Sequence, residues 1–559
     1  MPIHGFPKYK MQKDGDPATS CFTRCPTRQR ILLLLTLVAV VSVYNLSQFF
    51  TMVQQKQPAY TYHETNPPPI RTDLRIDSEL RGTSVEEQLH ILLNESTYDV
   101  TVHIPLLEWE NKVDPYPKAL MQTNWTNELP VKESFVFSNL QRICLSDRDV
   151  ILRSITSNQI QMENSISHAM VYKNYSNLLS VLKECPAIDI YIPEKTRGNG
   201  YCEDAVAYIR GLNTRLLPRW VLHDTFYDPA VGKNLTYFEI CPSTGLMFFN
   251  HYWDNFTKLA TWPKKKPIYL MPNTEMYELT AEHLWQSDVV LTKTVDAYQR
   301  TTKWFQQNGN PRNTVVFYTR HTTTNVLALD SKSIDKDFDN VRLLHTPGAS
   351  WQKNTVEIAL CWKRNPSLPL LEIFGPPELL EWEDFADSAW RLSNHSNYKL
   401  YTKDLSSREF SKLLARTTFF LCPSRMEGYG HYINQARAAG GVILTTNAPP
   451  MNELITSTSG VLVPFGKRRS SVHQLLGGNH NSSNGLKNAP GIEAIVKPSH
   501  IREAVYHLLS NTSVAERKMM AQEAKRQYAF DTNFFLYKME ILQAFASQKV
   551  ANAELSNDY

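Results

Sequence analysis

The sequence predicts an α/β fold with two Rossmann-like domains that face a cleft. The first observation is the stretch 418–465, in which an apolar run, a glycine-rich turn, a helical stretch and two more apolar runs follow one another. The second is the stretch 188–213, which repeats the order of apolar strand, glycine-containing turn and helix. Alternating strands and helices of this kind build parallel sheets, so we expect one sheet in each half of the chain.

Residues 31–50 predict a transmembrane signal anchor, because this apolar stretch has the length of a membrane-spanning helix. The preceding residues 1–30 hold six basic and two acidic residues, whereas only Lys56 follows closely. The positive-inside rule therefore predicts a cytosolic tail over 1–30 and a luminal remainder. A cleaved signal peptide is the alternative, and the long leading tail argues against it.

Residues 51–130 are predicted to form a stem, since the first part is polar and contains Pro67-Pro68-Pro69. The end of this stem is left open, because the pattern over 81–180 is mixed. Eight N-x-S/T triplets follow the anchor, at Asn94, Asn124, Asn174, Asn234, Asn255, Asn394, Asn481 and Asn511. Six cysteines also follow it and could form disulfides, whose pairing the sequence does not reveal.

The charge of the chain excludes a nucleic-acid partner. The formal net charge is +4, and residues 1–30 carry all of it, so the remainder has no net basic field. The anchor and the N-x-S/T triplets together predict a single-pass type II protein of the Golgi or endoplasmic reticulum membrane.

The first Rossmann-like domain is predicted over 131–328. We expect strands at 188–191, 219–223, 267–271, 287–292 and 314–318, and helices at 203–213 and 280–286. Two glycines, Gly198 and Gly200, occupy the turn after the strand that begins at Ile188, and Asn273 and Glu275 follow the strand over 267–271. That these polar and glycine residues line a cleft between the domains is implied by a family resemblance.

A polar run over 330–340 predicts the connection to a second domain over 341–520. Strands are expected at 341–344, 398–401, 419–421, 442–444 and 460–464, and helices at 355–363, 405–416, 431–439 and 501–509. A last helical stretch over 514–545 follows. Within it, residues 521–547 are predicted as a separate C-terminal helix; that this helix packs back on the first domain is implied by a family resemblance and not by its periodicity.

The turn before the helix over 431–439 favours phosphate binding. The backbone N–H groups from Gly428 to His431 would be the unpaired first-turn amides at the positive end of this helix. Glu427 and Gln435 lie eight residues apart, and both could face the crevice at the strand ends.

This stretch resembles the nucleotide-sugar site of retaining GT-B glycosyltransferases of the family 4 type. The matching residues are Pro423-Ser424, Glu427-Gly428-Tyr429-Gly430, Ala436 to Gly440, Val442 to Thr446, and Pro450 with Glu453. Three positions depart from the family pattern. Gln435 replaces a glutamate, Gly348 stands where an arginine is usual, and Asn273 or Glu275 occupies a strand end that often carries histidine.

The resemblance implies transfer of a sugar from a nucleotide-sugar to a hydroxyl of a glycan, glycoprotein or glycolipid, with retention of configuration. It implies catalytic roles for Glu427, Lys353 and Glu275, where Lys353 neutralises the leaving diphosphate. The implied donor-binding residues are Gly428, Tyr429, Gly430, His431, Gln435, Glu453 and Ser350. Gly198, Gly200 and Asn273 are implied on the acceptor side.

The resemblance also implies that no metal and no cofactor are needed, with the nucleotide-sugar as a substrate. Three Asp-x-Asp triplets, at Asp147-Arg148-Asp149, Asp335-Lys336-Asp337 and Asp337-Phe338-Asp339, follow no clear apolar strand. We interpret them as solvated loop charges rather than as metal ligands.

A catalytically inactive GT-B-fold protein that binds nucleotide or glycan is the main alternative, because of the three departures from the family pattern. A hydrolase or a sugar-nucleotide epimerase of the same fold fits the membrane anchor poorly. The sequence identifies neither the sugar, the nucleotide base nor the acceptor.

Overall fold

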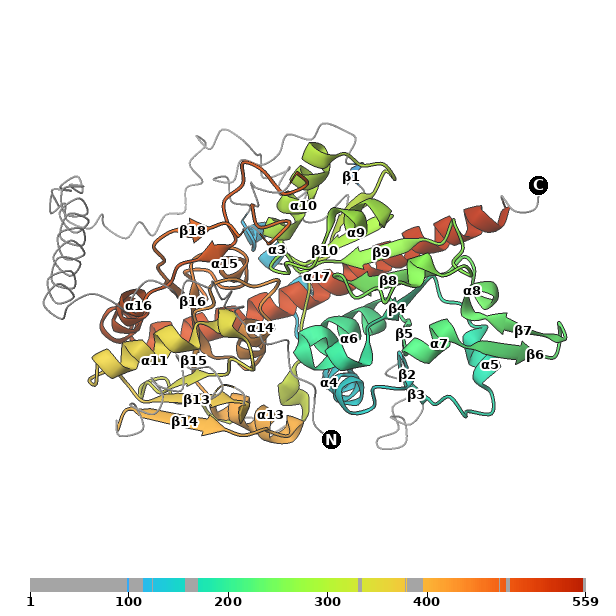
Figure 1. Cartoon of the computed structure of the whole chain (residues 1–559). Coiled ribbons are helices and arrows are strands. Elements are labelled where there is room, and N and C mark those ends of the chain that lie inside the picture. The colour runs from blue at the N-terminus through green and yellow to red at the C-terminus, as the bar shows by residue number, and fades with distance from the viewer. Residues whose placement is uncertain are drawn as a thin grey trace, which may run out of the picture. The chain divides into compact units, whose positions relative to one another are not determined.

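The computed structural model describes residues 98–99, 114–122, 124–155, 169–329, 334–377, 379, 396–471, 473–478 and 483–555. Figure 1 shows an α/β architecture with two groups of strands and a long C-terminal helix. The predicted anchor over 31–50 lies outside the described residues. Within the part that the structure describes, no helix is both long and apolar enough to cross a membrane.

The first sheet has nine strands among the described residues. In spatial order they are β1 (Tyr98–Asp99), β11 (Val315–Tyr318), β10 (Val289–Thr292), β9 (Ile268–Met271), β8 (Gly245–Phe249), β4 (Ile188–Tyr191), β5 (Arg215–Leu217), β2 (Ile151–Arg153) and β3 (Met170–Val171). The six strands from β11 to β5 are mutually parallel, and β1, β2 and β3 pair antiparallel to their inner neighbours. The helices of this half are α3 (Lys118–Met121), α4 (Val131–Ser146), α5 (Leu178–Leu182), α6 (Cys202–Gly211), α7 (Arg219–His223), α8 (Tyr237–Ile240), α9 (Ala281–Gln286) and α10 (Val295–Asn308).

The second sheet is parallel throughout, with six strands in the described part. Their order is β14 (Tyr398–Thr402), β13 (Leu371–Gly375), β12 (Leu343–His345), β15 (Phe419–Cys422), β16 (Val442–Thr446) and β17 (Gly460–Val463). The helices that follow them are α11 (Thr355–Arg364), α13 (Ser407–Arg416), α14 (His431–Ala438), α15 (Met451–Leu454), α16 (Pro498–Asn511) and α17 (Val514–Leu555). Two short antiparallel ribbons, β6 (Thr225–Asp228) with β7 (Lys233–Thr236) and β18 (Arg468–Arg469) with β19 (Glu493–Ala494), complete the fold.

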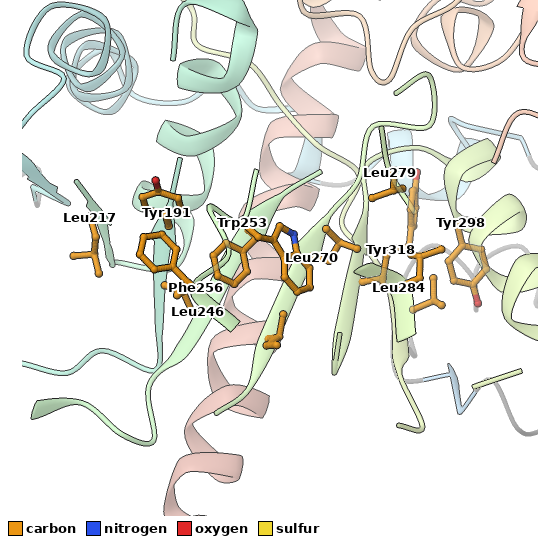
Figure 2. Close-up of a cluster of buried hydrophobic side chains, with 14 of the residues drawn as sticks. Tyr191, Leu217, Leu246, Trp253, Phe256, Leu270, Leu279, Leu284, Tyr298 and Tyr318 are labelled. Atoms are coloured by element: carbon orange, nitrogen blue, oxygen red, sulfur yellow. The ribbon is translucent and has the colours of Figure 1, made fainter. Parts of the chain in front are cut away.

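Both sheets bury apolar side chains on both faces, as parallel sheets covered by helices do. In β8, Leu246 and Phe248 enter one core cluster, whereas Met247 and Phe249 enter the other. Figure 2 shows part of the first cluster, in which Trp253 and Phe256 lie near Tyr191 and Leu246. This alternation follows from the two-residue period of a strand.

The predicted α/β class with two parallel sheets is confirmed, and most predicted strands and helices lie within two or three residues of their observed positions. The strand predicted at 219–223 is wrong, because these residues form α7. Five residues are too few for their hydrophobic periodicity to distinguish a helix from a strand. Pro218 precedes the helix, a position that favours a helical start.

Residues within the predicted stem range contact the folded part. Strand β1 pairs with β11 at the edge of the first sheet. The Tyr116 hydroxyl donates a hydrogen bond to Asp531 of α17 at 2.9 Å, and Trp125 packs on Phe530 and Phe534. The limits of the stem and of the two domains stay predictions.

Candidate active site

The candidate site lies where the carboxyl ends of the two sheets meet. From the first sheet come the start of α6 after β4, Asn273 and Glu275 after β9, and the residues that follow β10 and β11. From the second sheet come the loops after β12 and β15, which carry Lys353 and Glu427. Ligands of open parallel sheets bind at this edge, because the helices that follow the strands point their positive ends toward it.

Glu427 and Lys353, which were both predicted as catalytic, form an ion pair. The Lys353 ammonium also lies 4.2 Å from the ring centroid of Tyr432. Ser424 donates a hydrogen bond to the same Glu427 oxygen that holds Lys353. The structure thus brings a cation and a carboxylate together beside the turn that starts α14, 74 positions apart in the chain.

Gly428 lies close to the loop after β9 of the first sheet. A Cβ atom at this position would lie 2.3 Å from Oε2 of Glu275 and 2.7 Å from Oδ1 of Asn273. Only glycine lets the backbone come this close. These two oxygens of Glu275 and Asn273 are buried and have no hydrogen-bond partner among the residues that the structure describes, so the cleft contains two acceptors available to a ligand hydroxyl or amide.

Burial raises the pKa of the Glu275 carboxyl to about 7, against the opposing effect of the Lys293 ammonium. The negative charge of Glu427 raises it further. A carboxyl with such a pKa exchanges a proton near neutral pH, which is a property of general acids and bases. This adds a physical reason to the predicted catalytic role of Glu275.

Helix α14 is preceded by Gly430, whose φ of +107° is natural only for glycine. The first backbone bonds of the helix run from Ile433 and Asn434 to the Gly430 carbonyl. The amides that precede Ile433 therefore lie at the positive end of the helix, close to Lys353. Together they form an electropositive surface of the kind that holds a diphosphate.

A second polar cluster joins the two halves around one oxygen of Asp204. Lys293 Nζ lies 2.9 Å, His321 Nε2 2.8 Å and His431 Nε2 3.0 Å from Asp204 Oδ1. Burial opposes ionisation of Asp204, but Lys293 and His431 hold its pKa well below the usual range. Burial also lowers the pKa of His321 to about 4, so this imidazole is neutral at physiological pH.

Asp204, His321 and His431 also have the donor types of a transition-metal site, and their ligand atoms lie within 4.8 Å of one another. The Lys293 ammonium, however, already contacts the same Asp204 oxygen. A divalent cation bound there would be repelled by this ammonium, so the donor set fits a metal poorly while Lys293 is charged. That no metal is required stays a prediction.

The predicted donor-binding residues have partners from the first sheet. Gln435 Nε2 donates to Glu203 at 3.3 Å, and Glu453 accepts the amides of Val295 and Asp296 at 2.7 and 2.9 Å. Tyr429 is buried and donates to the carbonyl of His321. The contacts of these residues with a nucleotide-sugar donor stay predictions.

The remaining predicted positions lie in the loops around the cleft. Ser350 donates to Gln352 in the loop after β12. A Cβ at Gly200 would lie 3.7 Å from His431, whereas one at Gly198 would lie 3.7 Å from Arg148. In the turn after β4, Gly200 therefore lies near the start of α14, and Gly198 lies near Arg148, which precedes β2.

Sequence reasoning missed four residues of the cleft: Glu203, Asp204, Lys293 and His321. Each follows an apolar strand of the first sheet within a few residues or starts the helix after it. A systematic search for polar residues just beyond strand ends would have found Lys293 and His321. Glu203 and Asp204 open the helix predicted over 203–213, so the same search extended to the first turns of helices would have found them.

The Asp-x-Asp triplets lie apart from this cluster. Asp149, Asp335, Asp337 and Asp339 are exposed, which confirms their interpretation as solvated charges, and Asp147 is half-buried.

Comparisons with known proteins add limited information. No family model matches the sequence, and no curated protein matches it either. Among solved structures, a trehalose 6-phosphate synthase from Burkholderia multivorans has a TM-score of 0.40 at 12% identity, over 65% of this chain and 77% of that one. A glycosyltransferase from Rickettsia africae has a TM-score of 0.39 at 11% identity, over 54% and 76%.

The pneumococcal O-GlcNAc transferase GtfA, solved with UDP and GlcNAc, has a TM-score of 0.35 at 12% identity, over 54% of this chain and 57% of that one. These proteins are glycosyltransferases or synthases by name. Their TM-scores are below 0.5, so the assignment of function rests on the cleft residues and not on these similarities.

Proposed function

We propose that this chain is a retaining glycosyltransferase that uses a nucleotide-sugar donor. The observation that carries the proposal is the Lys353–Glu427 ion pair beside the N-terminus of α14, opposite Glu275 and Asn273 of the first sheet. A leaving diphosphate needs positive charge, which Lys353 and the helix terminus supply. The sugar and its acceptor need hydrogen-bonding groups, which Glu427, Glu275 and Asn273 supply.

In this reaction the bond between the anomeric carbon and the diphosphate oxygen breaks, and a bond to the acceptor oxygen forms on the same face. The acceptor hydroxyl proton goes to the departing phosphate oxygen, so the protein need not take it up. Donor binding would draw Lys353 from the Glu427 carboxylate to the phosphates and free that carboxylate for the sugar hydroxyls.

We also propose a single-pass type II protein whose catalytic part is in the lumen of the Golgi or endoplasmic reticulum. Two disulfides, Cys144–Cys202 and Cys185–Cys241, support an oxidising compartment. All N-x-S/T asparagines in the described part are exposed, namely Asn124, Asn174, Asn234, Asn255 and Asn511. If the proposal holds, an N-glycosidase will lower the mass of the cell-expressed protein, and an unchanged mass would count against a luminal location.

The test of activity uses the purified chain, a panel of UDP-, GDP- and CMP-sugars with glycan acceptors, and EDTA in every reaction. We expect nucleotide release from one donor, and loss of this release in Glu427→Ala. Binding of a nucleotide without release, seen as a thermal shift, would favour the catalytically inactive alternative. Release that EDTA abolishes would contradict the expected independence from metal.

A further inference from the structure

A surface cavity lies beside the outer pair of strands of the first sheet. Its volume is about 520 Å³, and it is lined by two segments of chain, residues 147–150 and 172–174. The first segment leads into β2, and the second follows β3, which pairs antiparallel with β2. Residues 172–174 are exposed, so the cavity is open to solvent on their side. Pockets for small ligands have volumes of about 300–1,000 Å³, so this cavity has room for a ligand.

One of the lining residues is an asparagine to which a ligand can be attached covalently. Asn174 begins the triplet Asn174-Tyr175-Ser176, which is an acceptor sequence for N-glycosylation. The triplet lies in a turn in which the Tyr175 amide donates to the Tyr172 carbonyl at 3.0 Å, and residues 172–177 are all exposed. Because Asn174 itself lines the cavity, a sugar on its amide nitrogen would start at the cavity.

Asn174 differs in this respect from the other N-x-S/T asparagines in the described part of the chain. Those at positions 124, 234, 255 and 511 are exposed as well, but none of them lines this cavity. Asn511, for example, is the last residue of α16 in the second half of the chain. It therefore provides a comparison site at which a glycan would start in open solvent.

The lining of the cavity suits an uncharged sugar. Tyr172 is 48% exposed, and the face of an exposed aromatic ring can cover the apolar face of a pyranose. The carboxylates of Asp147 and Asp149 can accept hydrogen bonds from sugar hydroxyls and from an acetamide N–H. Arg148 and Lys173 also line the cavity, so the formal charges of its lining sum to zero and favour neither an anion nor a cation.

The wall that precedes β2 is held in place by hydrogen bonds from its backbone. The Asp147 amide donates to the Ile143 carbonyl of α4 at 2.8 Å. Trp220 Nε1 donates to the Asp149 carbonyl at 3.2 Å. A sugar that packs on a wall of this kind loses less free energy to ordering the protein than one that packs on a mobile loop.

We propose that Asn174 carries an N-linked glycan whose first N-acetylglucosamine packs in this cavity, with one face on Tyr172. In the modification, the Asn174 amide nitrogen forms a bond to the anomeric carbon of an oligosaccharide that is linked to a lipid diphosphate. The bond from that carbon to the phosphate oxygen breaks, the lipid diphosphate leaves, and the amide nitrogen gives up one proton. A luminal oligosaccharyltransferase of the host cell catalyses this step. The inference therefore rests on the luminal location proposed above and not on sugar transfer by this chain.

A glycan at this position would also cover the end of the first sheet. Strand β3 is the outermost strand on this side among the described residues, and it ends three residues before Asn174. Exposed edge strands can pair with strands of other chains. A glycan packed beside β3 would block such pairing.

The test uses the full chain purified from a eukaryotic host. An N-glycosidase converts each glycosylated asparagine to aspartate, so peptide mass spectrometry gives the occupancy of each triplet and the rate at which its glycan is released. We expect a glycan on Asn174 in most molecules. Each rate in the folded protein is divided by the rate in the unfolded protein. We expect this ratio to be at least about tenfold lower at Asn174 than at another occupied triplet such as Asn511, because the packed sugar must leave the cavity before the enzyme reaches it.

Tyr172→Ala should keep the glycan on Asn174, because the triplet is unchanged. It should raise the release ratio at Asn174 to that of the comparison site, because the sugar loses the ring on which it packs. Tyr227→Ala is the matched control, since Tyr227 is an exposed tyrosine on β6, outside the cavity lining. It should leave release at Asn174 slow.

An unmodified Asn174 in a chain that is glycosylated elsewhere would overturn the inference and leave the luminal location standing. A chain without any glycan would overturn both. Release from Asn174 as fast as from the comparison site would overturn packing in the cavity, and release that stays slow in Tyr172→Ala would overturn the contact with Tyr172. A glycosylated Asn174 in a chain without donor turnover would contradict the proposed activity alone.

Discussion

Glu275 and Glu453 are half-buried residues on facing edges of the two sheets, and desolvation of their carboxyl groups raises the pKa of both to about 7. Asp204, which is buried, has its pKa held well below the usual range by Lys293 and His431, against the effect of burial. Three carboxyls in one cleft thus differ in charge at neutral pH because of their partners. Such divergence is typical of catalytic sites.

Glu275→Gln should make protein stability less dependent on pH. The folded-state pKa of Glu275 lies above the ordinary value of 4.5, so the folded protein binds this proton more tightly than the unfolded chain. The wild type therefore loses stability as pH rises from about 4.5 through about 7, and the loss is complete above that range. We expect Glu275→Gln to exceed the wild type by about 1–2 kcal/mol at pH 8, and by little at pH 5.

Urea unfolding at both pH values measures this difference. Glu282→Gln is the control, because Glu282 lies in α9 and hydrogen-bonds Gln286 at the surface. An equal effect of Glu275→Gln at pH 5 and pH 8 would show that Glu275 does not titrate in this range.

Lys353→Met should reduce donor turnover by about 100-fold, since one lost electrostatic contact to a developing negative charge costs this much. Steady-state nucleotide release measures it. Lys399→Met is the control, because Lys399 is exposed on β14. Turnover that is unchanged in Lys353→Met would remove Lys353 from the catalytic machinery.

At the scale of elements, the cleft depends on two close contacts, one covalent and one steric. The disulfide Cys144–Cys202 ties the first residue of α6 to α4. It therefore fixes the helix turn that carries Glu203 and Asp204. Gly428 fixes the distance between the loop after β15 and the loop after β9.

Cys144→Ser should lower the free energy of unfolding by about 2–4 kcal/mol, because the disulfide closes a loop with a sequence separation of 58. We expect donor turnover to fall at temperatures at which the variant is still folded, since α6 loses its anchor. Cys361→Ser, at a buried free cysteine, removes a thiol without opening a loop and should keep turnover. Equal turnover in Cys144→Ser would show that packing alone positions α6.

Gly428→Ala should lower donor turnover while the protein remains folded, because the added methyl would lie 2.3 Å from Oε2 of Glu275 and displace the Glu275 and Asn273 side chains. Nucleotide release and circular dichroism measure the two effects. Gly466→Ala is the control, since its added Cβ has no neighbour closer than 3.7 Å. A fully active Gly428→Ala would show that the close contact of Gly428 with Glu275 and Asn273 is not needed for catalysis.

At the scale of the whole molecule, α17 connects the two sheets through Asp531. The Asp531 carboxylate pairs with Arg320, which follows β11, and with Arg437 of α14 at 2.7 Å. Tyr116 donates to the same carboxylate. All four side chains are buried, so one acidic residue neutralises two guanidinium groups from different halves. Figure 1 shows the long helix α17 running past both groups of strands.

Asp531→Ala should destabilise the protein by about 3–5 kcal/mol, because it leaves two buried arginines without their carboxylate. Urea unfolding measures the change. Glu523→Ala, which removes a largely solvated pair with Arg526 on the same helix, should cost less than about 1 kcal/mol. Similar costs for the two variants would argue against a central role of Asp531.

The sequence predicted much of the fold because its signals are local. The apolar run 419–421 and the glycines before and after the helix at 431–439 each define an element by their neighbours in the chain. Short pieces such as 219–223 were predicted wrongly for the same reason, since too few residues carry the pattern. The first part of the folded region, including α4, was not predicted, because its periodicity is weak.

The candidate site was predicted in part. Lys353 and Glu427 were placed together by the family resemblance, and the structure shows that they are in contact. Glu203, Asp204 and His321 were missed, because their importance arises from residues that lie 89 to 232 positions away in the chain. Asp204 and His431, for example, are 227 residues apart in the chain.

The sequence alone determined the α/β class, the strand–turn–helix order and the residues that end the strands, because backbone propensity and apolar periodicity act over a few neighbouring residues. The tertiary structure decided which of these strand ends meet and which carboxyls keep their protons. Those properties depend on burial and on charges from distant parts of the chain. Desolvation and electrostatic pairing are set only when the chain has folded and the two sheets have come together.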